Sequence, residues 1–143
     1  MDIKILAVGK IKDRPYLQKI EEYADRIRHD AKLVIVEIRD AGPESEAERI
    51  LDHCGRDHAE VFALDERGKL FTSLEFARAI SAVPRRIIFV IGGPEGLSDR
   101  VKKSVRACIA LSPMTFTHEM ARLLLVEQIY RAISIIKGRK YHK

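Results

Sequence analysis

Cysteine is scarce in this sequence, with only Cys54 and Cys108 among 143 residues. Two cysteines are too few for a disulfide framework, so we expect both to be packing residues in a reducing compartment such as the cytoplasm. The first residues also lack a basic leader and an apolar stretch of signal-peptide length. These absences predict a cytoplasmic protein without a membrane partner.

Two phosphate-binding signatures are also missing. The turn at residues 8–11, which follows the first apolar segment, lacks the G-x-G-x-x-G pattern of dinucleotide-binding proteins, and no G-K-S/T P-loop occurs anywhere. Zinc-binding spacing is missing as well, since His53, Cys54 and His58 have no second pair of ligands at a recognised spacing. The common dinucleotide, triphosphate and zinc sites are therefore not expected.

What is present is the composition of one globular domain. A length of 143 residues is close to the commonest domain size, so residues 1–143 are expected to share a single core. Apolar residues make up 46% and charged residues 33%, which is typical of a folded protein. The net charge of +5, from 26 Lys and Arg against 21 Asp and Glu, permits a nucleic acid partner without requiring one.

The basic residues are not evenly spread. They gather at residues 10–14, 85–86, 102–106 and 137–143. Each of the first three clusters is most simply a solvated surface. The terminal cluster is the exception, because its charge is compatible with RNA binding.

Apolar spacing predicts strands that alternate with helices along the chain. Strands are predicted at residues 3–8, 32–38, 60–64, 86–91 and 109–111. Helices are predicted at residues 15–28, in a segment opened by Pro43, at 72–82, in a segment capped by Ser98 with Asp99, and at 119–137. This alternation is typical of an open, mostly parallel sheet with helices on both faces.

Three helices carry further signals. Thr72 followed by Glu75 is a capping box at the start of one helix. In the helix after Ser98 the predicted inward positions are Val101, Val105 and Cys108. The last helix is apolar on more than one face and needs more partner surface than a single sheet offers, which predicts a homodimer.

The glycine-rich turn at residues 91–96 directly follows the predicted central strand. Ligands of open parallel sheets bind outside the carboxyl ends of the strands, where Gly92, Gly93 and Gly96 stand. The alternative is a tight turn that uses glycine only for its backbone conformation. The acidic Glu95 and Asp99 lie where a helix start would otherwise attract phosphate, so a ligand without phosphates, such as S-adenosylmethionine, fits better.

Four segments together resemble a known family. They read IGGPEGLS at residues 91–98, LSPMTFTHEMAR at 111–122, EQIYRA at 127–132 and YHK at 141–143. They closely resemble, in the same order, motifs of the ribosomal large-subunit pseudouridine N3-methyltransferases, the minimal members of the SPOUT class. The resemblance extends from the first strand to the last residue.

The resemblance implies a SPOUT-type α/β knot, in which the C-terminal part of the chain threads a loop and forms a trefoil knot at the cofactor cleft. Apolar periodicity cannot indicate such a knot, because true knots are nearly absent from proteins. The resemblance also implies that the enzyme uses S-adenosylmethionine, without a metal, to methylate N3 of a pseudouridine in large-subunit (23S) ribosomal RNA.

Cofactor binding is assigned by this resemblance to three loops. Their residues are Leu64, then Gly92, Gly93 and Gly96, then Leu111, Ser112, Pro113, Met114, Thr115 and Phe116. Each loop follows a predicted strand on the same sheet edge, so the three can converge on one adenosine.

Catalysis is assigned to the chain end. His142 is the candidate base or positioning group, since imidazole titrates near neutral pH, whereas Tyr141 would contact the base and Lys143 would hold a phosphate. The alternative for all three is a disordered terminus. His118 and Arg122, one helical turn apart, could face the same cleft, or could be a helix cap and a surface ion pair.

The substrate is expected to be ribosomal RNA within the assembled ribosome. One small subunit without an RNA-binding domain has little surface with which to select a site on naked RNA. In a homodimer, the tail of one subunit could complete the pocket of the other. The alternative from another functional class is a non-catalytic ribosome-binding or nucleotide-sensing module.

Overall fold

Five strands form one parallel sheet in the computed structural model, which describes all 143 residues. The strands are β1 (Asp2–Val8), β2 (Lys32–Ile38), β3 (Glu60–Leu70), β4 (Ile87–Ile91) and β5 (Ala107–Ala110). They lie in the order β2-β1-β4-β3-β5, and every residue of the central strand β4 is buried. The continuous apolar run therefore forms a strand that is covered on both faces.

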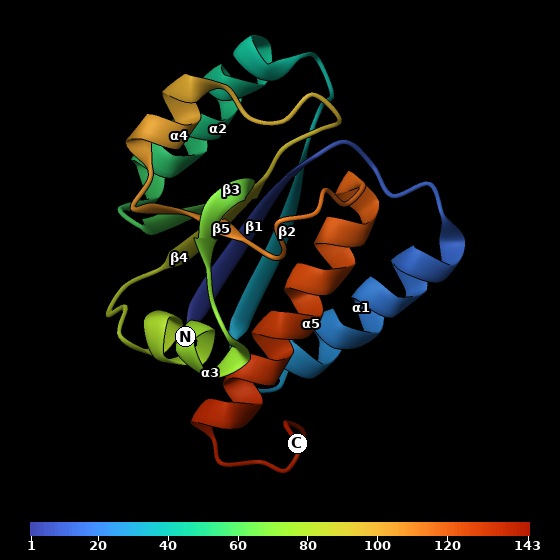
Figure 1. Ribbon diagram of the computed structural model, residues 1–143, viewed down its shortest axis with the longest axis vertical. Coiled ribbons are helices and arrows are strands. Elements are labelled where there is room, and N and C mark those ends of the chain that lie inside the picture. The colour runs from blue at the N-terminus through green and yellow to red at the C-terminus, as the bar shows by residue number, and fades with distance from the viewer.

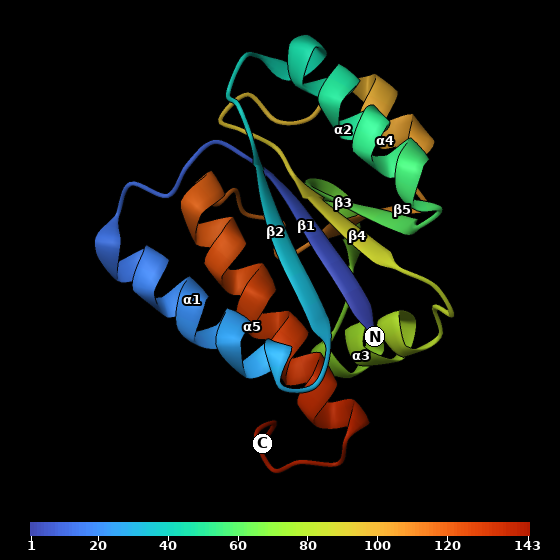
Figure 2. The same cartoon turned by 180° about the vertical axis from the view of Figure 1, so that it is seen from behind.

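Five helices cover the two faces of this sheet (Figures 1 and 2). The helices α1 (Arg14–Arg28), α3 (Ser73–Ser81) and α5 (His118–Ile136) pack on one face, and α2 (Pro43–Asp57) and α4 (Asp99–Ser104) on the other. Alternation along β1 serves both layers, because Ile3 and Ile5 join the first core and Leu6 and Val8 join the second. The predicted α/β architecture with helices on both faces is confirmed.

The local helix signals are confirmed as well. The hydroxyl of Thr72 accepts a hydrogen bond from the Glu75 amide, and the Glu75 carboxylate accepts one from the Thr72 amide. Pro43 is the first residue of α2, and the Ser98 side chain caps α4 by accepting from the Val101 amide. Each signal acts within one helical turn, so the sequence alone specifies it.

Three elements have boundaries that differ from the prediction by two residues or more. The strand predicted at residues 109–111 is β5, which spans Ala107–Ala110. The helix α4 ends at Ser104, so Val105 is extended and Cys108 lies in β5, where it pairs with Ala63 of β3. This pairing, made by residues distant in sequence, ends the helix early. The strand β3 runs to Leu70 rather than ending at Leu64, and a register shift between Leu64 and Lys69 interrupts it.

The interruption in β3 brings two backbones into close approach. A Cβ atom on Gly68 would lie 2.6 Å from the carbonyl carbon of Cys108, so only glycine fits where this segment passes β5. The trefoil knot that the resemblance implies for the C-terminal part of the chain stays a prediction. None of the five helices has the length and apolar character needed to cross a membrane.

Candidate active site

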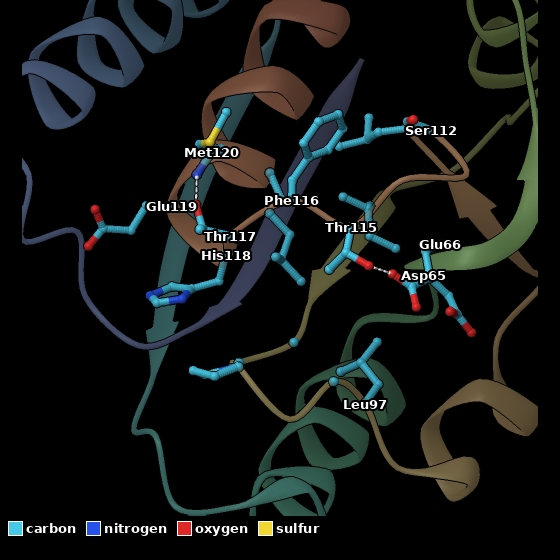
Figure 3. A pocket seen from close by; sticks show the side chains of 18 of the residues that line it. Asp65, Glu66, Leu97, Ser112, Thr115, Phe116, Thr117, His118, Glu119 and Met120 are labelled. Atoms are coloured by element: carbon cyan, nitrogen blue, oxygen red, sulfur yellow. Dashed lines mark hydrogen bonds between the residues drawn. The ribbon is translucent and has the colours of Figure 1, made fainter.

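A cleft of about 1030 Å³ opens at the carboxyl ends of the strands (Figure 3). Three segments form most of its wall, with Tyr16 and Lys102 also in the lining. They are residues 64–67, where the register shift interrupts β3, residues 91–97, and residues 111–121, which run from the loop after β5 into α5. All of the predicted cofactor residues except Pro113 line this cleft, and so does His118. The parallel sheet is what brings the three loops together, since the carboxyl ends of all five strands lie at the same edge.

The glycine turn after β4 is a closed backbone structure. The Gly96 amide donates a 2.9 Å hydrogen bond to the Gly93 carbonyl oxygen, and the two residues form an isolated antiparallel bridge. Gly93 packs directly on the sheet, because a Cβ atom there would lie 3.0 Å from Cγ1 of the buried Val8. At Gly93 the backbone itself therefore lies close against Val8 of the sheet.

The chemistry of the cleft wall suits a cationic nucleoside. Apolar side chains that can enclose an adenine ring come from all three loops: Leu64, Ile91, Leu97, Leu111 and Phe116. Four carboxylates also line the cleft: Asp65, Glu66, Glu95 and Glu119. S-adenosylmethionine combines an aromatic adenosine with a positively charged sulfonium, and this mixture of apolar and acidic groups fits it.

The Asp65 carboxylate is one charge that the structure holds firmly. Burial alone would raise its pKa, but the amide of Arg67, at 3.1 Å, and the ammonium of Lys102, also at 3.1 Å, hold the pKa below its ordinary value. Glu66 accepts a hydrogen bond from the Thr115 hydroxyl, which ties the loop after Leu64 to the loop after β5. Asp65 is therefore ionised at neutral pH, and Glu66 connects two segments of the cleft wall.

His118 and Arg122, which were expected to face the cleft together, lie in different surroundings. His118 lines the cleft, whereas the Arg122 side chain is 4% exposed and lies beneath it. Arg122 donates to the Glu37 carboxylate at 2.7 Å and to the Gly9 carbonyl oxygen at 2.9 Å. Arg122 thus fixes the loop after β1, and its ion pair joins a buried arginine to a Glu37 side chain that is 41% exposed.

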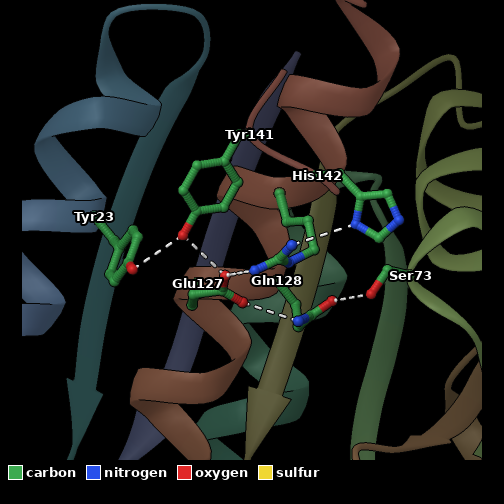
Figure 4. Close-up of polar contacts among 7 residues, drawn as sticks. Tyr23, Ser73, Glu127, Gln128, Tyr141 and His142 are labelled. Carbon is green, nitrogen blue, oxygen red and sulfur yellow. Dashed lines mark hydrogen bonds and ion pairs between the residues drawn. The ribbon is translucent and has the colours of Figure 1, made fainter. Parts of the chain in front are cut away.

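The C-terminal tail is ordered against α5 and α1 (Figure 4). The Tyr141 hydroxyl donates to Glu127 at 3.0 Å and lies 3.0 Å from the Tyr23 hydroxyl, which must therefore be the donor of that second bond. Burial, with the bonds to Tyr23 and Glu127, raises the pKa of Tyr141 far above its usual range. The exposed Lys143 is the last residue of this segment.

The imidazole of His142 contacts Arg131. A guanidinium nitrogen of Arg131 lies 3.3 Å from Nδ1 of His142, and the same guanidinium donates to Glu127 at 2.5 Å. Because arginine can only donate, Nδ1 accepts, and the proton of the neutral ring is on Nε2. The free nitrogen of His142 is therefore a hydrogen-bond donor.

Tail and cleft lie apart within one subunit. Arg131 follows His118 by 13 residues of continuous helix, which corresponds to about 20 Å along the axis of α5 at 1.5 Å per residue. Figure 1 shows the chain end beside the far end of α5 from the cleft. One subunit therefore does not bring Tyr141, His142 and Lys143 together with the cofactor loops.

Several residues of the site were not identified as site residues from the sequence. Glu127 and Arg131 lie in the EQIYRA segment, and Glu119 lies in the segment at residues 111–122. Both segments carry the family resemblance, so the sequence did point to these three residues. Tyr16 and Tyr23 are separated from the other site residues by long stretches of chain, and only the fold places them there. No group of three or more His, Cys, Asp or Glu side chains has a metal-binding arrangement.

Comparisons with known proteins agree over the whole chain. Residues 1–142 match a family described as predicted SPOUT methyltransferase. The ribosomal RNA large subunit methyltransferase H of Prochlorococcus marinus is 44% identical over 141 residues, which cover 98% of this chain and 94% of that protein. The protein of the same name from Coprothermobacter proteolyticus is 40% identical over 147 residues, with both chains fully covered.

Solved structures support the fold. A probable methylase family protein from Haemophilus influenzae Rd KW20 superposes with a TM-score of 0.63 at 16% sequence identity. The alignment covers 99% of this chain and 70% of the other. At this identity the likeness concerns architecture alone.

Proposed function

This chain belongs to the SPOUT methyltransferase family, and we propose that it transfers a methyl group from S-adenosylmethionine to N3 of a pseudouridine in large-subunit ribosomal RNA. The observation that carries the proposal is the convergence of the three predicted cofactor loops on one cleft. The names of relatives that are 40% and 44% identical over the whole chain support ribosomal RNA as the substrate. Such a substrate places the enzyme in the cytoplasm.

Cofactor binding depends on backbone and apolar groups in this proposal. Leu64, Leu111 and Phe116 enclose the adenine ring, and the glycine turn after β4 approaches the nucleoside through its backbone. The carboxylates that line the cleft would stabilise the positive end of the ligand. S-adenosylmethionine supplies an electrophilic methyl group on a good leaving group, so the transfer needs no metal.

Positioning of the acceptor base is the main catalytic contribution. Alignment of two reactants supplies roughly 7 to 11 kcal/mol, whereas a general base contributes about a hundredfold to ten-thousandfold. His142 acts as base or positioning group at N3, Tyr141 contacts the base, and Lys143 holds a phosphate. His118 is the one candidate that already lies in the cleft of the same subunit.

A homodimer is required to join tail and cleft. An apolar cavity of about 290 Å³ lies between α3 and α5, and it shares Leu111 and Phe116 with the cleft. Leu124 lines this cavity and remains 36% exposed. Leu70 and Leu74, which flank the lining residues 71–73 in the sequence, are 53% and 45% exposed. A second subunit that covers this face would bring its own tail close to the cofactor loops.

The form of the substrate follows from the size of the protein. With a net charge of +5 and 143 residues, one subunit offers limited surface for selecting a single nucleotide in naked RNA. We therefore expect the assembled ribosome to be the substrate. Free ribosomal RNA that is methylated as fast as whole ribosomes would contradict this expectation.

The test is mass mapping of large-subunit ribosomal RNA from cells that lack this protein. Loss of one methyl group from one pseudouridine, restored by the purified enzyme with S-adenosylmethionine, is the expected result. Calorimetry separates the alternative of a non-catalytic module. A protein that binds ribosomes but neither S-adenosylmethionine nor its demethylated product would be such a module.

A further inference from the structure

The loop between β1 and α1 carries positive charge without ion-pair partners. Lys10, Lys12 and Arg14 are exposed, and none of them lies within ion-pair distance of a carboxylate. Many other basic side chains are paired, as Lys102 is with Asp65 and Arg139 is with Asp30. Three unpaired cations thus lie within five residues, with Lys10 and Lys12 in the loop and Arg14 at the first position of α1.

The backbone of this loop, residues 9–13, is fixed at both ends. At the first end, the Gly9 amide donates to Ile38 at 2.8 Å and the Gly9 carbonyl oxygen accepts from Arg122 at 2.9 Å. At the other end, the Lys12 amide donates to the Glu119 carboxylate at 2.7 Å, which lowers the pKa of Glu119. The first turn of α5 therefore holds the loop in place from two residues, Glu119 and Arg122.

The fixed loop lies at the mouth of the cleft. Glu119 and His118 line the cleft, as does Tyr16 in the first turn of α1 (Figure 3). Both ribbon views place the loop beside the start of α5 (Figures 1 and 2). The nearby carboxylates are engaged elsewhere, because Asp13 caps α1, Glu37 pairs with Arg122 and Glu119 binds the loop backbone.

We propose that Lys10, Lys12 and Arg14 bind backbone phosphates of the ribosomal RNA next to the nucleotide that enters the cleft. This inference rests on the proposed function and names the surface through which the substrate is held. Phosphate contacts position a nucleic acid strand and do not read its sequence, which suits a site whose chemistry depends on alignment. A loop that is already fixed loses little conformational entropy when it binds.

The test compares two pairs of substitutions with the same charge change. The loop variant carries Lys10→Gln and Lys12→Gln, which remove two charges from the loop. The control variant carries Lys32→Gln on β2 and Lys103→Gln on α4. Both control lysines are exposed, form no ion pair and lie outside the cleft lining. Affinity for ribosomes and for S-adenosylmethionine, and kcat and KM for methyl transfer, are measured for both variants and the wild type at several salt concentrations.

The loop variant should show a smaller salt dependence of ribosome binding. Loss of two phosphate contacts lowers the slope of log affinity against log salt by about 1.4 to 1.8. Between 50 and 200 mM salt the wild type should therefore lose roughly tenfold more affinity than the loop variant. KM for ribosomes should rise, with kcat and cofactor affinity unchanged, and the control pair should match the wild type.

Other outcomes overturn the proposal in distinguishable ways. Equal slopes for the loop and control variants would show that the loop does not contact phosphate. Weaker S-adenosylmethionine binding in the loop variant would assign the lysines to the cofactor instead. A wild type that neither binds nor methylates ribosomes would refute the proposed function itself.

Glu119→Ala provides an independent test of the fixed loop. The substitution removes a negative charge, so simple electrostatics predicts tighter binding to RNA. Release of the Lys12 amide predicts weaker ribosome binding instead, because the loop is no longer held. An increase in ribosome affinity would contradict the role of the tether.

Discussion

His142 is held by a group that can only donate hydrogen bonds, and this limits what the imidazole can do. With Nδ1 bound to Arg131, the other ring nitrogen of neutral His142 carries the proton. The imidazole can then donate to a carbonyl oxygen of the base, but it cannot accept a proton at Nε2. The geometry therefore favours the positioning role over the general base.

Replacement of His142 distinguishes these two roles. In His142→Ala the donor is lost, and single-turnover methyl transfer should fall by about a hundredfold or more while S-adenosylmethionine binding is kept. In His142→Asn an amide N–H can still donate, so this variant should retain more activity than the alanine variant. Equal loss in both variants, with a pH profile that loses its acidic limb, would indicate a general base.

Gly93 lies where close packing against the sheet disfavours any residue with a side chain. A Cβ atom would lie 3.0 Å from Cγ1 of Val8, which is 1% exposed at the carboxyl end of β1. Gly93→Ala should therefore lower the free energy of unfolding by about 1 to 3 kcal/mol, measured by urea denaturation, and weaken cofactor binding.

Gly55→Ala is the matched control for Gly93→Ala. Gly55 lies in α2, and a Cβ atom there would meet nothing within 4 Å. Alanine in a helix interior is favoured over glycine, so the same change should stabilise the fold by about 0.5 to 1 kcal/mol. A Gly93→Ala variant as stable as the Gly55→Ala variant would refute the packing argument.

At the scale of elements, local signals were predictable and long-range ones were not. The run Ile87–Ile91 specifies a buried strand, and Thr72 with Glu75 specifies a helix start, because each signal acts between near neighbours. The end of α4 at Ser104 depends instead on β5 pairing with β3, for example Cys108 with Ala63, which lie far apart in the sequence. No pattern within residues 98–108 contains that information.

Asp30 is one of two carboxylates that anchor the chain after α5, the other being Glu127, which binds Tyr141. Asp30 accepts from both terminal nitrogens of Arg139, at 2.6 and 2.8 Å, and from Lys137 at 2.9 Å. The hydrogen bonds from Arg139, followed by that from Lys137, hold the pKa of Asp30 far below its usual range. The anchor is therefore charged at every pH at which the protein is expected to work.

Asp30→Asn tests the pH dependence of this anchor. A carboxyl whose pKa is lowered by folding stabilises the folded state above its unfolded pKa of about 3.9, and that contribution is lost as pH falls toward the folded value. Urea denaturation should show Asp30→Asn less stable than the wild type at pH 7, with the difference shrinking below about pH 4. Asp25→Asn, at a 71% exposed side chain, should show little difference at any pH.

At the scale of the whole molecule, the cleft was predictable and its separation from the tail was not. The parallel sheet places Leu64, Gly92 and Leu111 at one edge, so their convergence followed from strand order in the sequence. The direction of α5 carries His142 away from that edge, and its length fixes the distance. If the tail and the cleft act in one site, as we propose, a second subunit must supply one of them.

A mixed dimer tests whether the two segments act between subunits. One subunit carries His142→Ala, and the other carries Ser112→Trp, which fills the cleft and should abolish S-adenosylmethionine binding by calorimetry. If the tail of each subunit serves the cleft of its partner, the mixed dimer contains one intact site and one doubly defective site. Purified through two different tags, it should show about half of the wild-type activity.

The same mixed dimer contains no intact site if tail and cleft act within one subunit, because each chain then carries its own defect. Activity near zero, equal to that of either homodimeric variant, would exclude the shared site. A mixed dimer of wild-type and doubly substituted chains provides the reference. In that dimer the intact tail and the intact cleft belong to the same subunit, so transfer between subunits predicts no activity, whereas transfer within one subunit predicts about half. The two mixed dimers thus exchange their expected activities between the two arrangements. A fully active monomer at low concentration would exclude transfer between subunits.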